Sequence, residues 1–350
     1  MRSFVVILAL IASALALAKH TPHLDEHLKL PKFAQELTGE ALVDYINEIQ
    51  TTWTATKDSR FFGMKSEEVR PFLGVLDAPE QYQNITSTHI SIKANLPTDF
   101  DARKQWPKCS KIIGTIRDQS NCGSCWAVAT VSAISDRICI HSDAKTLVHV
   151  SAQDLMSCCR NCGMGCNGGY PESAWDYYYS QGIVSGGQYG DTHTCRPYPF
   201  EPCAHHVDGT EYKNCPSKIE KTPACNQRCV TRYLTYSSDK HRSTGSVNVW
   251  RNEESIMQEV LTNGPVEAAF SVYEDFLTYK SGVYEHKAGR YAGGHAVRVI
   301  GWGVENGVKY WLVANSWNEG WGDEGTFKIL RGKNHCGFEA RMTSGIPKLT

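Results

Sequence analysis

QSNCGSCW, residues 119–126, is the stretch of sequence that says most about this fold. Residues 126–140, which follow it, are apolar on nearly every face and contain neither Gly nor Pro, which predicts a buried helix. Cys125 would then lie at the helix N-terminus, where free N–H groups and the helix dipole stabilise a thiolate. The pair Cys122 and Cys125 also forms a CxxC motif, which by itself fits a zinc ligand pair, a redox pair or a half-cystine.

A thiolate nucleophile needs a base, and Gly293-Gly294-His295-Ala296 offers one. Residues 297–303 are typical of a strand, Asn306-Gly307 of a two-residue hairpin turn, and residues 309–317 of the returning strand. His295 and Asn315 are therefore expected near the same open end of one hairpin, where an amide could orient the imidazole. A plain register would place Asn315 opposite Arg298, so the pattern alone does not bring the two side chains together.

Composition and the N-terminus indicate a secreted globular protein. The 350 residues are 41% hydrophobic and 21% charged, and the net charge of −1 gives no electrostatic case for nucleic acid or an anionic membrane. Arg2, the apolar run 4–17 and Ala16-Leu17-Ala18 predict a signal peptide over residues 1–18. That run is too short to span a bilayer and no other approaches ~18 residues, so we expect no membrane association after its removal. Fourteen cysteines fit the secretory pathway, with a lysosomal or an extracellular (digestive) destination.

Residues 19–95, called here the N-terminal segment, differ from the rest of the chain. They contain no cysteine, and 8 basic against 11 acidic residues give a net charge of −3. One amphipathic helix is predicted over Gly39–Trp53, from the spacing of Leu42, Tyr45, Ile46, Ile49 and Trp53. A segment that docks on the remainder, or is removed, explains this better than an independent domain. Asn84 lies in the chain's one glycosylation sequon and is the predicted acceptor.

The segment around Cys125 matches the cysteine signature of the papain family, CGSCW. GGHAVRVIGWG (293–303) and YWLVANSWNEGWGDEG (310–325) resemble the family's His and Asn segments. Residues 96–350 resemble the cathepsin B-like members in particular, at AISDRICIH, CNGGYPESAW, CRPY, NGPVEAAFSVYEDFLTYKSGVY and FKILRG. YINEIQTTW resembles their short propeptide. The resemblance implies an α+β, papain-like two-domain fold, a helical domain and a β-barrel-like domain with a cleft between them, preceded by the inhibitory propeptide 19–95.

The resemblance also assigns roles to individual residues. Cys125 is the nucleophile, His295 the general base and acid, and Asn315 the residue that orients the imidazole. Gln119, with the backbone N–H of Cys125, forms the oxyanion hole. The substrate-binding residues implied are Gly168, Gly169, Tyr170, Pro171, His205, His206, Ala269, Gly294, Ala296, Trp317 and Arg341.

Within this set, four residues form an apolar pocket for the second residue before the scissile bond, the P2 residue: Tyr170, Pro171, Ala269 and Ala296. Related enzymes commonly carry an acid at the far end of the pocket, whereas counting from Cys336 places Arg341 there. An arginine there opposes a basic P2 side chain, so Phe-Arg substrates should be cleaved better than Arg-Arg ones. Two alternatives are open: an Arg341 side chain that turns outward, or a Glu339 side chain that folds back and restores a negative charge.

His295 and Asn315 lie 170 and 190 residues after Cys125, against about 130–150 in the general family pattern. The surplus falls in residues 195–229, a stretch rich in Cys and Pro that resembles the occluding loop of cathepsin B-like enzymes. There His205 and His206 match the pair that binds a substrate's terminal carboxylate, implying dipeptidyl carboxypeptidase activity. One of the loop's two latching ion pairs is retained, between Asp118 and His205. The other is lost, because Glu211 or Lys213 and Gly320 or Glu319 stand at its positions, so we expect a looser loop and a larger endopeptidase share.

Removing Cys125 leaves thirteen cysteines, so at least one more is unpaired. The resemblance implies that this is Cys336, and that the others pair as Cys109–Cys139, Cys122–Cys166, Cys158–Cys225, Cys159–Cys162, Cys195–Cys229 and Cys203–Cys215. A zinc site at Cys158, Cys159, Cys162 and Cys166 is the alternative. We expect no metal and no cofactor.

The function expected is a cysteine peptidase made as a zymogen, with endopeptidase and dipeptidyl carboxypeptidase activity. Its expected partners are peptide and protein substrates, its own propeptide and cystatin-like inhibitors, and it should be a monomer that binds no nucleic acid. Two alternatives are a catalytically silent, disulfide-rich binding protein on the same fold and a CxxC oxidoreductase using Cys122 and Cys125.

Overall fold

A helix that begins at Cys125 forms the centre of the helical part of the molecule. The computed structural model describes residues 30–50, 52–64, 66–83, 88, 90–92, 95–204, 212–216 and 218–349. In it α8 spans Cys125–His141 and is buried along almost its whole length, which confirms the predicted helix. Its apolar side chains pack against α9 (Ala152–Cys158) and α10 (Pro171–Ser180) around Trp126 and Trp175. Short helical turns precede it: α6 (Ala102–Gln105), η2 (Pro107–Cys109) and α7 (Ser110–Ile113).

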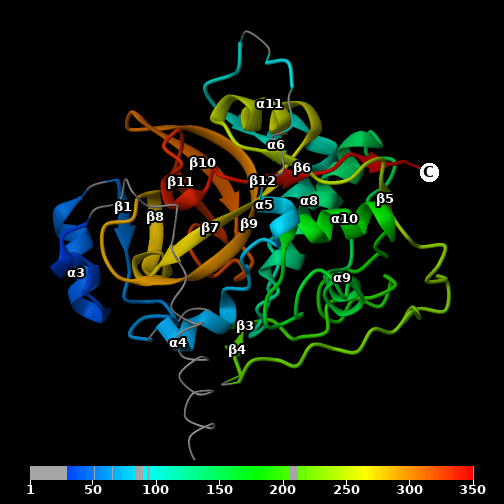
Figure 1. Cartoon of the computed structure of the whole chain (residues 1–350), viewed down its shortest axis with the longest axis horizontal. Coiled ribbons are helices and arrows are strands. Elements are labelled where there is room, and N and C mark those ends of the chain that lie inside the picture. Colours follow the sequence, from blue (N-terminus) through cyan, green and yellow to red (C-terminus); the bar gives the residue numbers. More distant parts are fainter. Residues whose placement is uncertain are drawn as a thin grey trace, which may run out of the picture. The chain divides into compact units, whose positions relative to one another are not determined.

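A mostly antiparallel sheet lies beside the helices (Figure 1). Its strand order is β1-β8-β11-β10-β9-β7-β12-β6, and β2 pairs with β9. The strands that follow the N-terminal segment are β2 (Phe100–Asp101), β6 (Asn248–Trp250), β7 (Val266–Tyr273), β8 (Tyr279–Tyr284), β9 (Tyr291–Glu305), β10 (Val308–Ala314), β11 (Thr326–Leu330) and β12 (Met342–Ser344). Helical elements α11 (Glu253–Asn263), η3 (Glu274–Thr278) and η4 (His335–Gly337) connect them. The fold is therefore α+β, with a helical part and a sheet part, as predicted.

The hairpin β9–β10 contains the turn expected at Asn306-Gly307. Both residues have positive φ, 51° and 81°, as a tight two-residue turn that follows the strand twist requires. The register starts at Val308 opposite Glu305, but it shifts by one between Leu312 and Val313. This bulge moves the end of β10 one residue closer to His295 than a plain register would.

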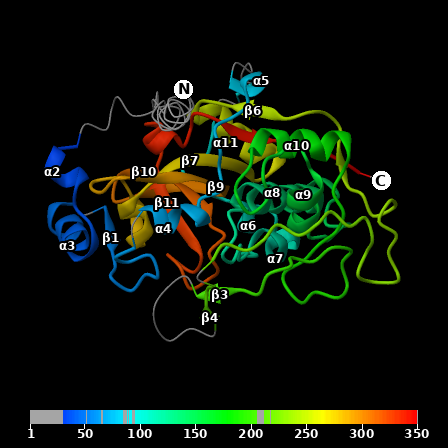
Figure 2. The same ribbon diagram turned by 60° about the horizontal axis from the view of Figure 1, so that its bottom comes forward.

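The N-terminal segment packs against the outer edge of this sheet, where β1 (Trp53–Ala55) pairs antiparallel with β8 (Figure 2). Its helix α3 spans Gly39–Ile49 and buries Leu42, Val43 and Ile46. The prediction that the helix continues to Trp53 was wrong. The Gln50 side-chain oxygen accepts hydrogen bonds from the backbone N–H groups of Thr52 and Trp53, which turns the chain into the strand. The other elements of the segment are α2 (Lys32–Gln35), α4 (Ser66–Val69), η1 (Arg70–Phe72) and α5 (Glu80–Gln83).

Six disulfides staple the helical part and the long loops that follow it: Cys109–Cys139, Cys122–Cys166, Cys158–Cys225, Cys159–Cys162, Cys195–Cys229 and Cys203–Cys215. These are the pairs that the resemblance implies, and Cys125 and Cys336 are the free thiols. The zinc alternative was therefore wrong, because the cysteines it needs are consumed in disulfides. The oxidoreductase alternative was wrong for the same reason, since Cys122 is bonded to Cys166.

The loop region contains only short paired segments: β3 (Cys203–Ala204) with β4 (Lys213–Asn214), and β5 (Arg242–Ser243) with β13 (Pro347–Lys348). Within the described part of the chain, no helix has the length and apolar character needed to cross a membrane. The predicted signal peptide, the glycosylation site Asn84, and His205 and His206 lie outside the described residues.

Candidate active site

Cys125, His295 and Asn315 come together where α8 meets the sheet. Cys125 is the first residue of α8, His295 lies in β9, and Asn315 directly follows β10. His295 Nε2 lies 2.8 Å from Asn315 Oδ1, and the same oxygen accepts the backbone N–H of Ser316 at 2.8 Å. Because that oxygen can only accept, Nε2 carries the ring proton and the lone pair of neutral His295 is on Nδ1. The amide therefore fixes the tautomer in which the other ring nitrogen can act as a base.

Trp317, predicted to bind substrate, is fully buried in the structure. Its ring stacks on His295 with 4.7 Å between the centroids, and it also packs against Phe61 of the N-terminal segment. It thus holds the imidazole plane from one side, and Trp321 and Phe276 pack against it as well.

Gln119 is connected to this cluster by Ser316, a residue that the sequence pattern does not single out. Ser316 Oγ donates to Gln119 Oε1 at 2.7 Å, and the Gln119 backbone N–H donates to Ser316 O at 2.9 Å. A run of hydrogen bonds therefore joins His295, Asn315, Ser316 and Gln119. The Gln119 Nε2 group donates to Phe72 O of the N-terminal segment at 2.9 Å and to Cys122 O at 2.8 Å. Ser316 could have been suspected only from its place next to Asn315.

The Cys125 thiol is covered in this structure. Gly74 donates its backbone N–H to Cys125 Sγ at 3.1 Å, and Val75 packs on the small cluster formed by Cys125, Ala129 and Ala296. Burial raises the pKa of Cys125 to about 12, although hydrogen bonds from the backbone of Ala296, Gly74 and Trp126 oppose the shift. The expectation of a thiolate at the helix N-terminus is therefore not met in the covered state, because desolvation of the sulfur outweighs the helix dipole.

Residues 73–76 run through the cleft in extended form and pair with backbone on both of its sides. Val75 N donates to Gly294 O at 3.0 Å, and Leu76 N donates to Gly169 O at 3.0 Å. Gly169 N in turn donates to Gly74 O at 2.9 Å. Of the residues expected to bind substrate backbone, Gly169 and Gly294 thus already hold an extended peptide. Gly168, with φ of +104°, lies against the Leu76 side chain.

The residues predicted to form the P2 pocket lie on two elements, the sheet and the start of α10. Ala269 lies opposite Ala296 in the β7–β9 ladder, and Tyr170 and Pro171 lead into α10. Arg341 does not turn outward freely: one of its nitrogens, Nη2, lies 2.8 Å from Glu172 Oε1. Glu339 does not fold back into the pocket either. Its carboxylate is buried and accepts the Trp311 indole N–H at 2.8 Å and the Asn334 backbone N–H at 2.9 Å.

The residues expected to latch the occluding loop are partly described. Asp118 is buried and accepts hydrogen bonds from the Cys203 backbone at 3.1 Å and from Asn318 Nδ2 at 2.9 Å. Lys213 pairs with Glu201 at 3.1 Å, inside the loop, with both side chains largely exposed. Glu211 and the histidine pair fall outside the described residues.

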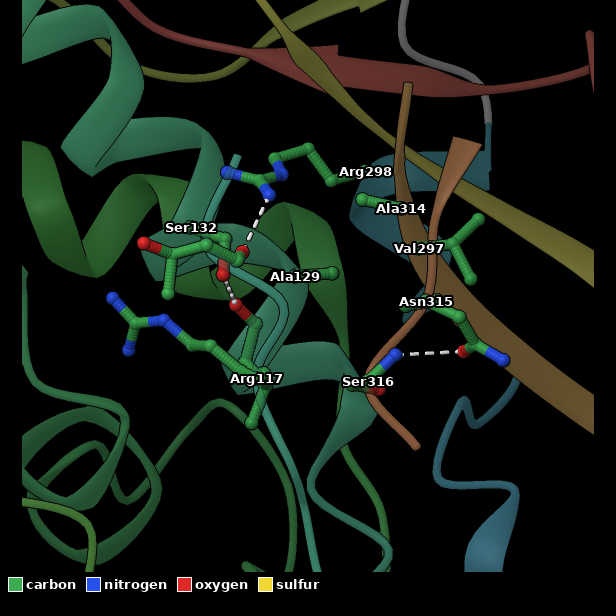
Figure 3. Close-up of a pocket in the computed structure, with 11 residues that line it drawn as sticks. Arg117, Ala129, Ser132, Val297, Arg298, Ala314, Asn315 and Ser316 are labelled. Atoms are coloured by element: carbon green, nitrogen blue, oxygen red, sulfur yellow. Dashed lines mark hydrogen bonds between the residues drawn. The ribbon is translucent and has the colours of Figure 1, made fainter. Parts of the chain in front are cut away.

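A small pocket lies between α8 and the strands β9 and β10, next to Asn315 (Figure 3). Arg298 on its wall makes two 2.8 Å hydrogen bonds to the Asp136 carboxylate, and both side chains are buried. This ion pair fastens the helix that carries Cys125 to the strand that carries His295. No local sequence pattern predicts this pair, because the two residues are 162 positions apart.

Comparisons with known proteins agree with this arrangement. A model of the family described as "Papain family cysteine protease" matches residues 96–346. Cathepsin B-like cysteine proteinase 6 of Caenorhabditis elegans is 47% identical over 90% of this chain and 85% of its own length. Cathepsin B-like cysteine proteinase of Schistosoma japonicum is 46% identical over 89% of this chain and 92% of its own.

Solved structures of proenzymes resemble this chain over most of its length. Procathepsin B S9 from Trypanosoma congolense superimposes with a TM-score of 0.77 at 36% identity, covering 89% of this chain and 99% of that one. Procathepsin L2 from Tenebrio molitor larval midgut gives a TM-score of 0.62 at 29% identity, covering 88% and 89%. The chain therefore belongs to the papain family of cysteine proteases, as a cathepsin B-like cysteine peptidase in its zymogen form.

Proposed function

We propose that Cys125, His295, Asn315 and Gln119 carry out peptide hydrolysis once the N-terminal segment has left the cleft. His295 Nδ1 takes the thiol proton, and the Cys125 sulfur attacks the peptide carbonyl. Gln119 Nε2 and the Cys125 backbone N–H stabilise the oxyanion, and His295 then protonates the leaving amine. Water, deprotonated by His295, hydrolyses the thioester and restores the thiol. Asn315 keeps the imidazole in the required tautomer throughout.

One observation carries this proposal: an extended peptide, residues 73–76, already lies in the cleft with Gly74 N 3.1 Å from the Cys125 sulfur. A backbone held there by Gly169 and Gly294 indicates where substrate binds. It also supports residues 19–95 as an inhibitory propeptide and 96–350 as the mature enzyme. Incubating purified zymogen at pH 4–5 should yield a mature N-terminus within a few residues of Leu96. It should also yield a Cys125 that reacts stoichiometrically with a thiol-directed epoxide. Full activity from unprocessed zymogen at neutral pH would refute the proposal, and so would a processed protein that binds peptides without cleaving them.

We propose further that residues 195–229 form an occluding loop, with His205 and His206 binding a substrate's terminal carboxylate. The Lys213–Glu201 ion pair supports a loop held across the cleft by a single ion pair. Lys213 already pairs with a residue of the loop itself and so does not reach across the cleft. An exposed ion pair contributes only ~0–1 kcal/mol, but that is enough to change loop populations several-fold. We therefore expect a substantial endopeptidase share beside dipeptidyl carboxypeptidase activity. Measuring both on one preparation checks this, and dominance of the carboxydipeptidase activity would contradict it.

For the cellular setting we propose entry into the secretory pathway through residues 1–18, glycosylation at Asn84, and delivery to a lysosome or to the outside of the cell. Six disulfides support an oxidising compartment. The mature enzyme should be a monomer that cystatin-like inhibitors block at the open cleft. Expression in a eukaryotic secretory host, with glycosidase digestion of wild type and Asn84→Gln, tests the first two points.

A further inference from the structure

Glu172 and Arg341 form an ion pair at the P2 pocket. Glu172 lies in the first turn of α10, directly after the pocket residue Pro171. Its Oε1 is 2.8 Å from Arg341 Nη2, and the two side chains are 7% and 22% exposed. Glu172 has no role in the mechanism proposed above, and nothing in the sequence pattern singles it out.

The strand register brings Arg341 next to a residue predicted to form the P2 pocket. Met342, the first residue of β12, is opposite Ala268 in β7, so Arg341 stands next to Ala269 at the end of that ladder. Ala269 in turn is opposite Ala296 in β9. Side chains directly opposite each other in antiparallel strands share a face of the sheet. Arg341, Ala269 and Ala296 therefore form one row, and Glu172 reaches the end of this row from α10.

In the zymogen the pair is capped by the propeptide. Arg341 Nη2 donates to the backbone oxygen of Tyr82 at 2.6 Å, and Tyr82 Oη donates to Asp176 on the same helix as Glu172. Tyr82 is only 6% exposed, so it is buried at this contact with Arg341 and α10. When the propeptide leaves, the guanidinium loses that acceptor while Glu172 stays beside it.

The other charged groups nearby are engaged elsewhere, neutral or exposed, so Glu172 and Arg341 are the charges that act at this pocket. Glu339 is engaged with Trp311 and the backbone of Asn334. Glu267, buried behind the pocket wall, accepts from Thr130 and Trp175, and burial raises its pKa to about 8, so it is neutral at acidic pH. Asp176 accepts the Val247 backbone N–H in addition to Tyr82. Arg251 is exposed, and its charge adds to the effect of burial in lowering the pKa of Arg341.

We propose that the Glu172–Arg341 pair determines P2 specificity, which presupposes the peptidase function proposed above. As a closed pair it gives the pocket an end wall with no net charge, so an apolar P2 residue is accepted. A charged P2 residue of either sign must compete with one partner for the other. Removing Arg341 leaves a carboxylate that accepts a basic P2 side chain, whereas removing Glu172 leaves a guanidinium that accepts an acidic one. The selectivity thus comes from two residues on different walls.

The test compares kcat/KM of the activated enzyme on Phe-Arg, Arg-Arg and Glu-Arg reporter peptides, which differ only at P2. Wild type should prefer Phe by more than about tenfold over both charged residues. Arg341→Gln should raise the Arg/Phe ratio about tenfold and leave the Glu/Phe ratio low. Glu172→Gln should do the reverse. Two exposed residues provide matched charge controls, Arg232→Gln and Glu254→Gln, and these should leave both ratios unchanged.

The double variant Glu172→Arg with Arg341→Glu keeps the pair with its charges exchanged and should return to the apolar preference. It also shows whether a failed single variant merely misfolded. Equal wild-type rates on Phe-Arg and Arg-Arg, or single variants that shift both ratios in the same direction, would overturn the proposal. Epoxide labelling of Cys125 and turnover of Phe-Arg report separately on the peptidase function. If both are normal while the ratios do not move, the specificity proposal alone has failed.

Discussion

The backbone N–H of Gly74 points at the Cys125 sulfur from 3.1 Å, so the propeptide blocks the nucleophile with main chain and not with a side chain. Such a close approach requires glycine. A Cβ on residue 74 would lie 1.9 Å from the backbone oxygen of Gly123, a contact that no small side-chain movement relieves. On either side of Gly74, Phe72 O accepts a hydrogen bond from the Gln119 side-chain amide, and Val75 N donates one to Gly294 O.

Gly74→Ala should therefore weaken inhibition by the propeptide. The methyl group forces residues 72–76 away from Gly123, so zymogen carrying it should process faster and show more activity before processing. Measuring the rate of appearance of mature enzyme at pH 4–5, and activity of unprocessed zymogen at pH 7, checks this. Gly245→Ala is the matched control, because a Cβ there meets nothing within 4 Å. Equal rates for Gly74→Ala and wild type would show that the contact does not limit inhibition.

The reactivity of Cys125 should change sharply on activation. In the zymogen burial raises the pKa of Cys125 to about 12, so below that pH the sulfur is a neutral thiol. A small alkylating reagent should leave Cys125 of the zymogen unmodified at pH 6–8. In the mature enzyme the sulfur should be exposed at the N-terminus of α8, and the same reagent should modify it within minutes. The modified cysteine is identified by mass spectrometry of the peptide that contains residue 125. Rapid modification of intact zymogen would contradict the burial argument.

Ser316→Ala should reduce turnover without weakening substrate binding. Ser316 Oγ holds Gln119 Oε1 at 2.7 Å, and without it the Gln119 amide is less well aimed at the oxyanion. We expect kcat to fall about tenfold with KM nearly unchanged, against about 10²–10³ for Gln119→Ala, which removes the donor itself. Ser132→Ala is a control: this buried serine bonds Val128 O and no catalytic residue. The rate of epoxide labelling of Cys125 should be unchanged in Ser316→Ala, and a parallel loss of labelling would indicate a structural defect instead.

Glu267 should make stability depend on pH. Burial raises its pKa from 4.5 to about 8, against opposing hydrogen bonds from Thr130 and Trp175. The folded protein therefore holds a proton that the unfolded chain releases above pH 4.5. Its contribution to stability is fully present below pH 4.5 and is lost as pH rises towards 8, at up to about 1.4 kcal/mol per pH unit.

Glu267→Gln should remove that part of the slope. Free energies of unfolding from denaturant titrations at pH 4.5–8, in a Cys125→Ala zymogen that cannot process itself, measure it. Buried Asp136, whose pKa is raised to about 6 by burial against the pull of Arg298, contributes its own slope, so the comparison is between variants at each pH. The exposed Glu254→Gln is the matched control. Identical slopes with and without Glu267 would exclude a neutral carboxyl group there.

The sequence predicted the elements whose patterns are local. The buried helix α8, the Asn306-Gly307 turn and its two strands follow from runs of residues that specify one conformation by themselves. The helix α3 was predicted but its end was not. Trp53 continues the helical spacing, yet it belongs to β1, where it stacks on Tyr279 and donates its indole N–H to Glu285 O. A helix and a strand can share apolar spacing over a few residues, and only the partner surface distinguishes them.

Cys125, His295, Asn315 and Gln119 could be proposed from the sequence, because each stands in a short, specific motif. Their chemistry in this structure could not. The bulge in β10 that brings Asn315 towards His295, the Ser316 contact to Gln119 and the raised pKa of Cys125 all depend on how distant segments pack. Glu172 and Arg341, 169 residues apart, carry no local signal of their pairing. Short motifs show which catalytic groups are present, because a motif is read from residues that are neighbours in the chain. Hydrogen bonds, ion pairs and desolvation act through space, so only the tertiary structure decides which groups meet and which charge survives.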